Sequence, residues 1–156
     1  MTSFKIKILP LSVIIFFIIL PVIDASILAS VNNKYGLVFF DLKEKYFSND
    51  KIKFSVSNIS NEQLTFYCSV EKFIDNRWRE IGSINNLKCS KAVKLDKLDP
   101  KNVLKQVWDH NHKCFSHVGR HGTFRFVVYI YSNSDHKIIG KIYSKEFIIF
   151  PFPSEK

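Results

Sequence analysis

Four of the five histidines in this chain fall within one short stretch, "WDHNHKCFSHVGRH", from Trp108 to His121. The same stretch contains Cys114 and Asp109. Imidazole and thiolate groups bind zinc and copper(I), and a cysteine beside a histidine is also the pair used in nucleophilic catalysis. The stretch therefore allows three kinds of chemistry: a metal site, a Cys–His nucleophile, or a polar loop held by a disulfide.

A metal site in this stretch would draw on five side chains: His110, His112, Cys114, His117 and His121. His110 and His112 would share a face of a strand, whereas His117 and His121, four residues apart, would meet only on a helix. The spacing matches neither HExxH nor CxxC, and Gly119 and Gly122 indicate a loop. We therefore assign no metal ligand and expect no cofactor, and we keep metal binding as an alternative.

A catalytic role for Cys114 would require a reduced, partly exposed thiolate beside a base. Asp109, Asn111 and His117 are near enough in sequence to be its partners. No signature of a cysteine enzyme surrounds Cys114, and no pair of carboxylates has the spacing typical of acid–base catalysis. We expect a protein without enzymatic activity and without catalytic residues.

The N-terminal segment, residues 1–25, has the three-part layout of a secretory signal peptide. Lys5 and Lys7 precede an apolar run over residues 8–23, and the small residues Ala25 and Ser26 follow. The apolar run is shorter than the roughly 20 residues that a membrane-spanning helix needs. We predict cleavage after Ala25, or after Ala29 as a second choice, with an uncleaved anchor as the alternative. The mature protein would be periplasmic or secreted, without an integral membrane span.

Export favours disulfide formation, so the three cysteines are predicted to form one bridge and leave one thiol. Cys68 lies within an alternating strand pattern on its apolar side, whereas Cys89 and Cys114 lie in segments that resemble loops. We predict a Cys89–Cys114 bridge, with Cys68–Cys89 as the alternative. A loop of about 25 residues closed in this way contributes roughly 3–4 kcal/mol in the chain-entropy treatment.

The chain is basic, with 23 lysines and arginines, 14 aspartates and glutamates and a net charge of +9. The lysines are spread along the sequence rather than gathered in one block, and no aromatic-basic motif accompanies them. We therefore expect no nucleic acid partner. A protein or a component of the cell envelope is the expected partner.

Short runs rich in β-branched and aromatic residues indicate the elements that must position the His/Cys stretch. Several alternate between apolar and polar residues, as strands with one buried face do. We predict strands over 35–42, 51–58, 64–73, 78–84, 103–110, 122–132 and within 137–150, and a tight turn at 75–77. About seven to eight strands over this length are typical of an antiparallel β-sandwich. The predicted organisation is a short N-terminal segment (26–34), the sandwich (35–150) and a tail (151–156).

From Gly36 to Ile149, the order of features resembles bacterial immunoglobulin-like domains of exported proteins. The resemblance rests on "KIKFSVSN", "VEKFIDNRW", "LDKLDPKNVLKQVW", "HGTFRFVVYIY" and "YSKEFII". Phe124 stands where such domains place a corner tyrosine, and "DPKN" replaces a proline-glycine pair. The resemblance implies an immunoglobulin-like sandwich that acts as a binding or spacer module, and it brings no catalytic residues.

The expected function is that of an exported, non-enzymatic binding module. Some relatives within the resemblance are similar to proteinase inhibitors, which suggests a second possibility in which residues 88–101 enter a protease cleft. Metal binding through residues 108–121 is a third. Trp78 and Trp108 are expected to be packing residues, because aromatic side chains strongly favour burial.

Overall fold

The computed structural model describes residues 34–84, 94–112, 114–115 and 119–153. Ten strands run through this part of the chain: β1 (Leu37–Phe40), β2 (Lys45–Phe47), β3 (Ile52–Asn58), β4 (Leu64–Ile74), β5 (Arg77–Ser83), β6 (Asp96–Leu98), β7 (Val103–Trp108), β8 (Gly122–Tyr131), β9 (Ile138–Tyr143) and β10 (Phe147–Phe150). Within the same residues, no helix has the length and apolar character that crossing a membrane requires.

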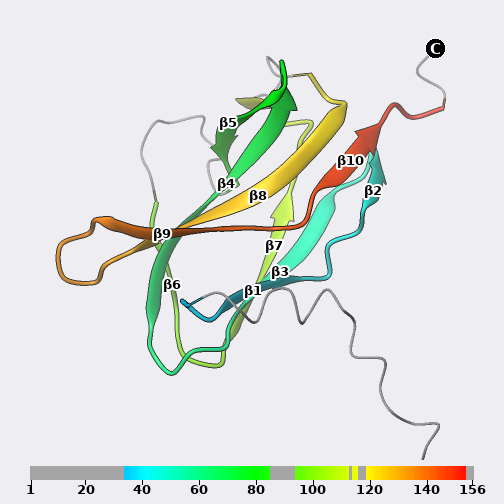
Figure 1. Cartoon of the computed structure of the whole chain (residues 1–156). Coiled ribbons are helices and arrows are strands. Elements are labelled where there is room, and N and C mark those ends of the chain that lie inside the picture. Colours follow the sequence, from blue (N-terminus) through cyan, green and yellow to red (C-terminus); the bar gives the residue numbers. More distant parts are fainter. Residues whose placement is uncertain (1–33, 85–93, 113, 116–118, 154–156) are drawn as a thin grey trace, which may run out of the picture.

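The strands form two layers, which confirms the predicted immunoglobulin-like β-sandwich (Figure 1). The smaller sheet has the order β1-β3-β7. The larger sheet has the order β2-β10-β8-β4-β5, with β6 added to one end of β4 and β9 to one end of β8. All the pairings are antiparallel except that of β2 with β10, which is parallel. The long strands β4 and β8 form the centre of the larger sheet.

The core between the sheets is built from the alternating residues of the central strands. Ile52, Phe54 and Val56 of β3 are buried, as the period-two pattern predicts, and face the even-numbered residues of β4 and β8. The closest aromatic contact across the sandwich joins Phe54 and Phe126, whose rings stack with their centroids 4.0 Å apart. Burial of these large side chains is the main favourable term that holds the two sheets together.

The turn predicted at 75–77 is confirmed as a two-residue hairpin between β4 and β5. Ile74 pairs with Arg77, and the intervening Asp75 and Asn76 both have positive φ, at 50° and 59°. A turn with two left-handed residues matches the right-handed twist of the flanking strands. Asp and Asn tolerate this conformation better than other non-glycine residues.

The structure has ten strands where the sequence pattern indicates seven or eight. The additional strands β2 and β6 are only three residues long. The C-terminal pattern, residues 137–150, divides into β9 and β10 at Ser144, whose hydroxyl accepts a hydrogen bond from the Phe126 amide and donates one to the Lys145 carbonyl. A backbone hydrogen bond from Ser144 to Phe126 adds to this anchor. The chain therefore changes direction at Ser144 without losing contact with β8.

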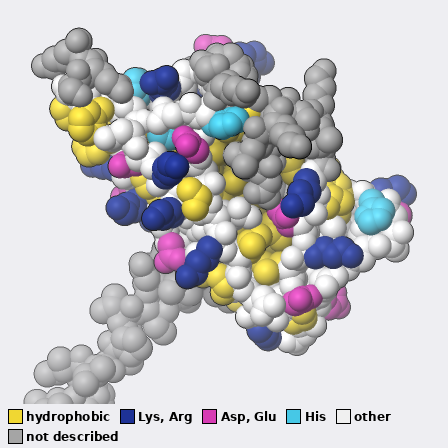
Figure 2. All heavy atoms as spheres, turned by 180° about the vertical axis from the view of Figure 1, so that it is seen from behind, with side chains coloured by type: hydrophobic (Ala, Val, Ile, Leu, Met, Phe, Trp, Pro, Cys, Tyr) yellow, Lys and Arg dark blue, Asp and Glu magenta, His cyan; other side chains and the backbone are white. Residues whose placement is uncertain are grey.

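The smaller sheet lies behind the larger one in Figure 1, so its outer side faces the viewer in Figure 2. Lysine and arginine side chains lie there among exposed hydrophobic side chains (Figure 2). The exposed apolar residues of β7 are Val103 and Val107, at 48% and 51% of their full accessible area. This side of the molecule thus combines positive charge with apolar surface.

Candidate functional site

The segment that follows β7 is a packed turn that covers one end of the sandwich. Trp108 is buried, as predicted, and its ring contacts Phe115, Phe124 and Phe126 at centroid distances of 5.5, 5.6 and 5.8 Å. Asp109 starts the turn by accepting hydrogen bonds from the amides of Asn111 and His112. The first half of the His/Cys stretch is therefore fixed by packing and local hydrogen bonds.

His110 belongs to this packed region. Its side chain is 3% exposed and its ring lies 5.7 Å from the Trp108 ring. Among the described residues, neither ring nitrogen has a hydrogen-bond partner of good geometry. Burial lowers the pKa of His110 below its ordinary value, an effect that the nearby Ser48 backbone only partly opposes. His110 is therefore held as a neutral side chain in the core rather than presented to solvent.

The candidate metal ligands that the structure describes do not form a single group. His112 Nδ1 lies 3.1 Å from Cys114 Sγ, whereas His121 is exposed and His110 is turned into the core. In the part of the chain that the structure describes, no three His, Cys, Asp or Glu side chains are grouped closely enough to hold a metal ion. His117 lies outside the described residues, so its part in the metal hypothesis stays untested.

The cysteines differ in their surroundings. Cys68 is a free thiol, 1% exposed in the core, and burial raises its pKa well above the ordinary value. Cys114 is half-buried, and its Sγ lies 3.1 Å from Nδ1 of His112. The partner predicted for it, Cys89, lies outside the described residues, and the Cys89–Cys114 pairing therefore stays a prediction.

The segment considered for protease inhibition, residues 88–101, is only partly described. Residues 88–93 lie outside the described part. Of the remainder, β6 pairs with β4 through Leu98 and Leu64, and the Leu98 side chain is 5% exposed. Within the described part of the segment, residues 96–98 are thus held against β4, and the inhibitor alternative stays a prediction.

A more distinctive arrangement lies on the outer side of the larger sheet, which we call the aromatic face. It consists of side chains from four neighbouring strands that all point away from the core: Glu71 and Phe73 of β4, Trp78 and Glu80 of β5, Arg125 and Tyr129 of β8, and Lys141 and Tyr143 of β9. The pairing registers place Glu71 opposite both Glu80 and Arg125. Residues far apart in sequence are thereby brought onto one surface.

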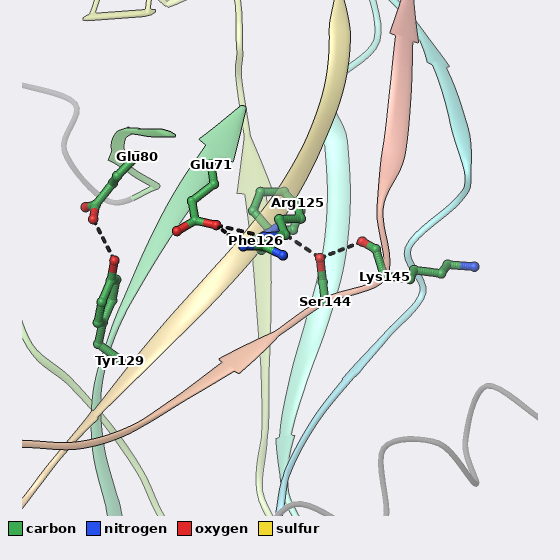
Figure 3. A network of polar contacts seen from close by, with 7 residues as sticks. All are labelled: Glu71, Glu80, Arg125, Phe126, Tyr129, Ser144 and Lys145. Atoms are coloured by element: carbon green, nitrogen blue, oxygen red, sulfur yellow. Dashed lines mark hydrogen bonds and ion pairs between the residues drawn. The ribbon is translucent and has the colours of Figure 1, made fainter. Parts of the chain in front are cut away.

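Arg125 is at the centre of the aromatic face. Its guanidinium carbon lies 4.1 Å from the ring centroids of both Trp78 and Tyr143. It also forms an ion pair with Glu71, at 2.7 Å from the carboxylate, and the two side chains are only 20% and 12% exposed (Figure 3). A planar guanidinium can stack on aromatic rings and bind a carboxylate at the same time. Arg125 thus ties together all four strands of the face.

A second polar group on the face centres on Glu80. One carboxylate oxygen accepts a hydrogen bond from the Tyr129 hydroxyl at 2.7 Å (Figure 3). The other accepts a hydrogen bond from the Ser69 hydroxyl at 2.7 Å. Burial and the neighbouring carboxylate raise the pKa of Tyr129, and Lys141 lies 4.8 Å above its ring. These contacts fix the tyrosine in one orientation as a neutral donor.

The aromatic face also has an exposed rim. Phe73 and Tyr143 are 43% and 45% exposed, and Phe73 contacts the Trp78 ring at a centroid distance of 5.3 Å. At the other end of β9 from Tyr143, Ile138 and Ile139 are 51% and 49% exposed. The result is an ordered polar centre bordered by aromatic and aliphatic surface.

The sequence pattern does not reveal this face, because its residues come from strands that are separate in the chain. The sequence predicts Trp78 as a packing residue. The structure agrees in part, because the Trp78 ring packs against the Arg125 guanidinium on the outer side of the sheet. The signal available in the sequence is the presence of Glu71, Arg125 and Tyr129 on the side of their strands opposite to the apolar residues. Only the pairing register shows that they are neighbours.

No family model matches the sequence, and no curated protein matches it either. Among solved structures, the chain is similar at 10% identity and a TM-score of 0.46 to a Salmonella enterica SafA pilin in complex with the SafB chaperone, over 80% of this chain and 58% of that one. It is similar to the E. coli chaperone DraB at 11% identity and a TM-score of 0.43, over 77% and 56% of the two chains.

A β-glucosidase from Listeria innocua is similar at 11% identity and a TM-score of 0.39, over 72% of this chain and 15% of that one. This chain thus spans between about one seventh and three fifths of the length of these structures. Similarity at this level concerns the fold alone, and it extends to proteins with different activities.

Proposed function

We propose that the domain is a non-enzymatic protein-binding module and that the aromatic face is its binding surface. The observation that supports the proposal most is Arg125, which is stacked between Trp78 and Tyr143 and paired with Glu71 before any partner is present. Residues of these types contribute most of the energy in protein interfaces. Because they are already fixed, a partner would not have to order them on binding.

The exposed rim is what a partner would cover. Phe73 and Tyr143 leave nearly half of their area accessible, although they border a well-ordered centre. Burial of such rings away from water contributes favourable free energy in proportion to the area removed. A partner with an apolar surface and an acceptor for the Tyr143 hydroxyl would fit this arrangement.

We also propose that the protein acts after export, with residues 1–25 removed as a signal peptide and Cys89 bridged to Cys114. The lysine-flanked apolar run and the small residues after it support export. N-terminal sequencing of the protein from the producing cells tests this step. A mature chain that begins at Ser26 is expected, whereas a protein that retains Met1 inside the cell would contradict export.

Photo-crosslinking tests the binding surface while the partner is still unidentified. A photoreactive phenylalanine analogue would replace Tyr143 or Phe73 in the full chain, in the cells that produce it. Ile59 is the matched control, because it is 42% exposed and lies outside the aromatic face. We expect a discrete protein adduct from the Tyr143 and Phe73 positions that the Ile59 position does not give. The same adducts from all three positions, or none from any, would contradict the proposal.

A further inference from the structure

The smaller sheet ends in a strand that pairs on one side only. β7 pairs with β3 over six residues, from Val103 opposite Ser57 to Trp108 opposite Ile52. Among the described strands, no other pairs with β7. A free strand edge of this kind presents backbone donors and acceptors that an extended segment of another chain can bind.

The register shows which backbone groups face outward. The Asn58 amide donates to the Asn102 carbonyl at 3.0 Å, so Asn102 is among the residues that bond to β3. In an antiparallel ladder these residues alternate with residues whose N–H and C=O groups point away. Val103, Lys105 and Val107 therefore direct their backbone groups to the free edge.

The side chains of the same three residues define what could bind there. Val103 and Val107 are about half exposed, and the exposed Lys105 lies between them on the same face. Lys53 is close by, because its strand partner is Val107. Neither lysine has an ion-pair partner in the described structure. Of the acidic residues nearby, Asp41 accepts a hydrogen bond from Ser55, the strand partner of Lys105, and Asp109 forms an ion pair with Lys51.

Charge also argues against pairing between two copies of this chain. Two β7 strands related by a two-fold axis would place Lys105 near the lysine of the other copy, and like charges across a strand pair are unfavourable. A lysine in the middle of an edge strand protects against such self-association. The same lysine would instead form a favourable ion pair with a carboxylate at the opposite position of a partner strand.

We infer that β7 is a second binding site, one that accepts an extended acidic strand from a partner protein as an antiparallel addition to the β1-β3-β7 sheet. The partner strand places a glutamate or aspartate opposite Lys105, with β-branched residues on either side that pack against Val103 and Val107. This site lies on the other sheet from the aromatic face and does not depend on the function proposed for that face.

The test uses a fluorescently labelled, blocked peptide of nine residues, in which valine and threonine alternate and the central valine is replaced by glutamate. The comparison peptide has lysine at the centre. Anisotropy titrations with the mature protein should show binding of the glutamate peptide and binding of the lysine peptide that is at least about fivefold weaker. The substitution Lys105→Glu should reverse the preference.

Val107→Pro removes one outward N–H without removing a hydrogen bond to β3, and it should abolish binding. Val107→Thr is the matched control, since it retains the N–H and the β-branched shape, and it should bind within about twofold of the original protein. Thermal unfolding checks that each variant is folded. Absence of binding by the original protein at millimolar concentration, or equal binding by the two Val107 variants, would overturn the inference. So would a preference that Lys105→Glu leaves unchanged.

Discussion

Arg125 is the residue on which the order of the aromatic face depends most. Replacement by methionine keeps much of the side-chain volume but leaves Glu71, whose side chain is 12% exposed, without its cation. An unpaired carboxylate in such a position is costly, and we expect a loss of about 3 kcal/mol in the free energy of unfolding. Chemical denaturation measures it.

The matched control is Arg79→Met. Arg79 also forms an ion pair at 2.7 Å, with Asp75, but its partner is 72% exposed. Loss of this pair should cost less than about 1 kcal/mol, because water solvates the remaining carboxylate. Equal losses for the two substitutions would show that the Arg125 pair is no more than an ordinary surface contact.

His110 makes the stability of the protein depend on pH. Its pKa is lowered in the folded state, because burial disfavours the imidazolium, whereas in the unfolded chain it titrates near the ordinary value of about 6.5. The stability associated with neutral His110 is therefore fully present above about pH 6.5 and is lost as the pH falls through the lower folded-state pKa.

We expect the thermal midpoint to fall between pH 7.5 and pH 5, and to fall less in His110→Phe. The control is His136→Asn at an exposed turn with φ of 53°, a conformation that asparagine tolerates. This control should keep the pH dependence of the original protein. If His110→Phe retained the full dependence, another group would have to be responsible.

At the scale of the elements, the β4–β5 hairpin depends on its two left-handed turn residues. Asn76 has φ of 59°, where a β-branched side chain is strained. Asn76→Val should destabilise the protein by about 1–2 kcal/mol, whereas Asn76→Gly should be neutral or slightly stabilising. Equilibrium unfolding of the two variants distinguishes them, and similar values for both would contradict the assigned turn geometry.

The elements that could be predicted from the sequence are those with their own alternating pattern. β3, β4 and β8 each have a long apolar side that fixes which residues are buried. β2 and β6 have three residues each, and they form by pairing with β10 and β4. These pairings depend on strands that are distant in sequence, so no local pattern could predict them.

The same distinction explains the candidate sites. The His/Cys stretch is conspicuous in sequence because its residues are adjacent, yet in the described residues His110 packs against Trp108, His112 contacts Cys114 and His121 is exposed. The aromatic face is inconspicuous because Trp78, Arg125 and Tyr143 belong to three strands. Proximity in sequence indicates which chemistry is available, but the strand register decides which groups meet.

At the scale of the whole molecule, the predicted Cys89–Cys114 bridge closes a loop of about 25 residues. Its removal by Cys114→Ser should cost roughly 3–4 kcal/mol of stability. Thiol titration of the oxidised protein should find no reactive thiol in the native state and one, Cys68, after denaturation, because Cys68 is buried. Three thiols in the denatured, unreduced protein would contradict the bridge.

The two sheets give the molecule two outer surfaces with different chemistry. The larger sheet presents the aromatic face, where Arg125 is paired with Glu71, and the smaller sheet presents Lys53 and Lys105 beside the edge of β7, with which no described strand other than β3 pairs. We therefore expect the two surfaces to bind different partners. Substitutions on one sheet should therefore leave binding to the other unaffected.

The central claim is that the aromatic face binds a protein, and the most direct measurement is the affinity for the partner captured by crosslinking at Tyr143. Tyr143→Asp is compared with Ile59→Asp, a substitution at a similarly exposed position outside the face. We predict that Tyr143→Asp weakens binding at least about tenfold, as loss of an interface anchor does, while Ile59→Asp leaves it unchanged. Equal affinities of the two folded variants would contradict the claim.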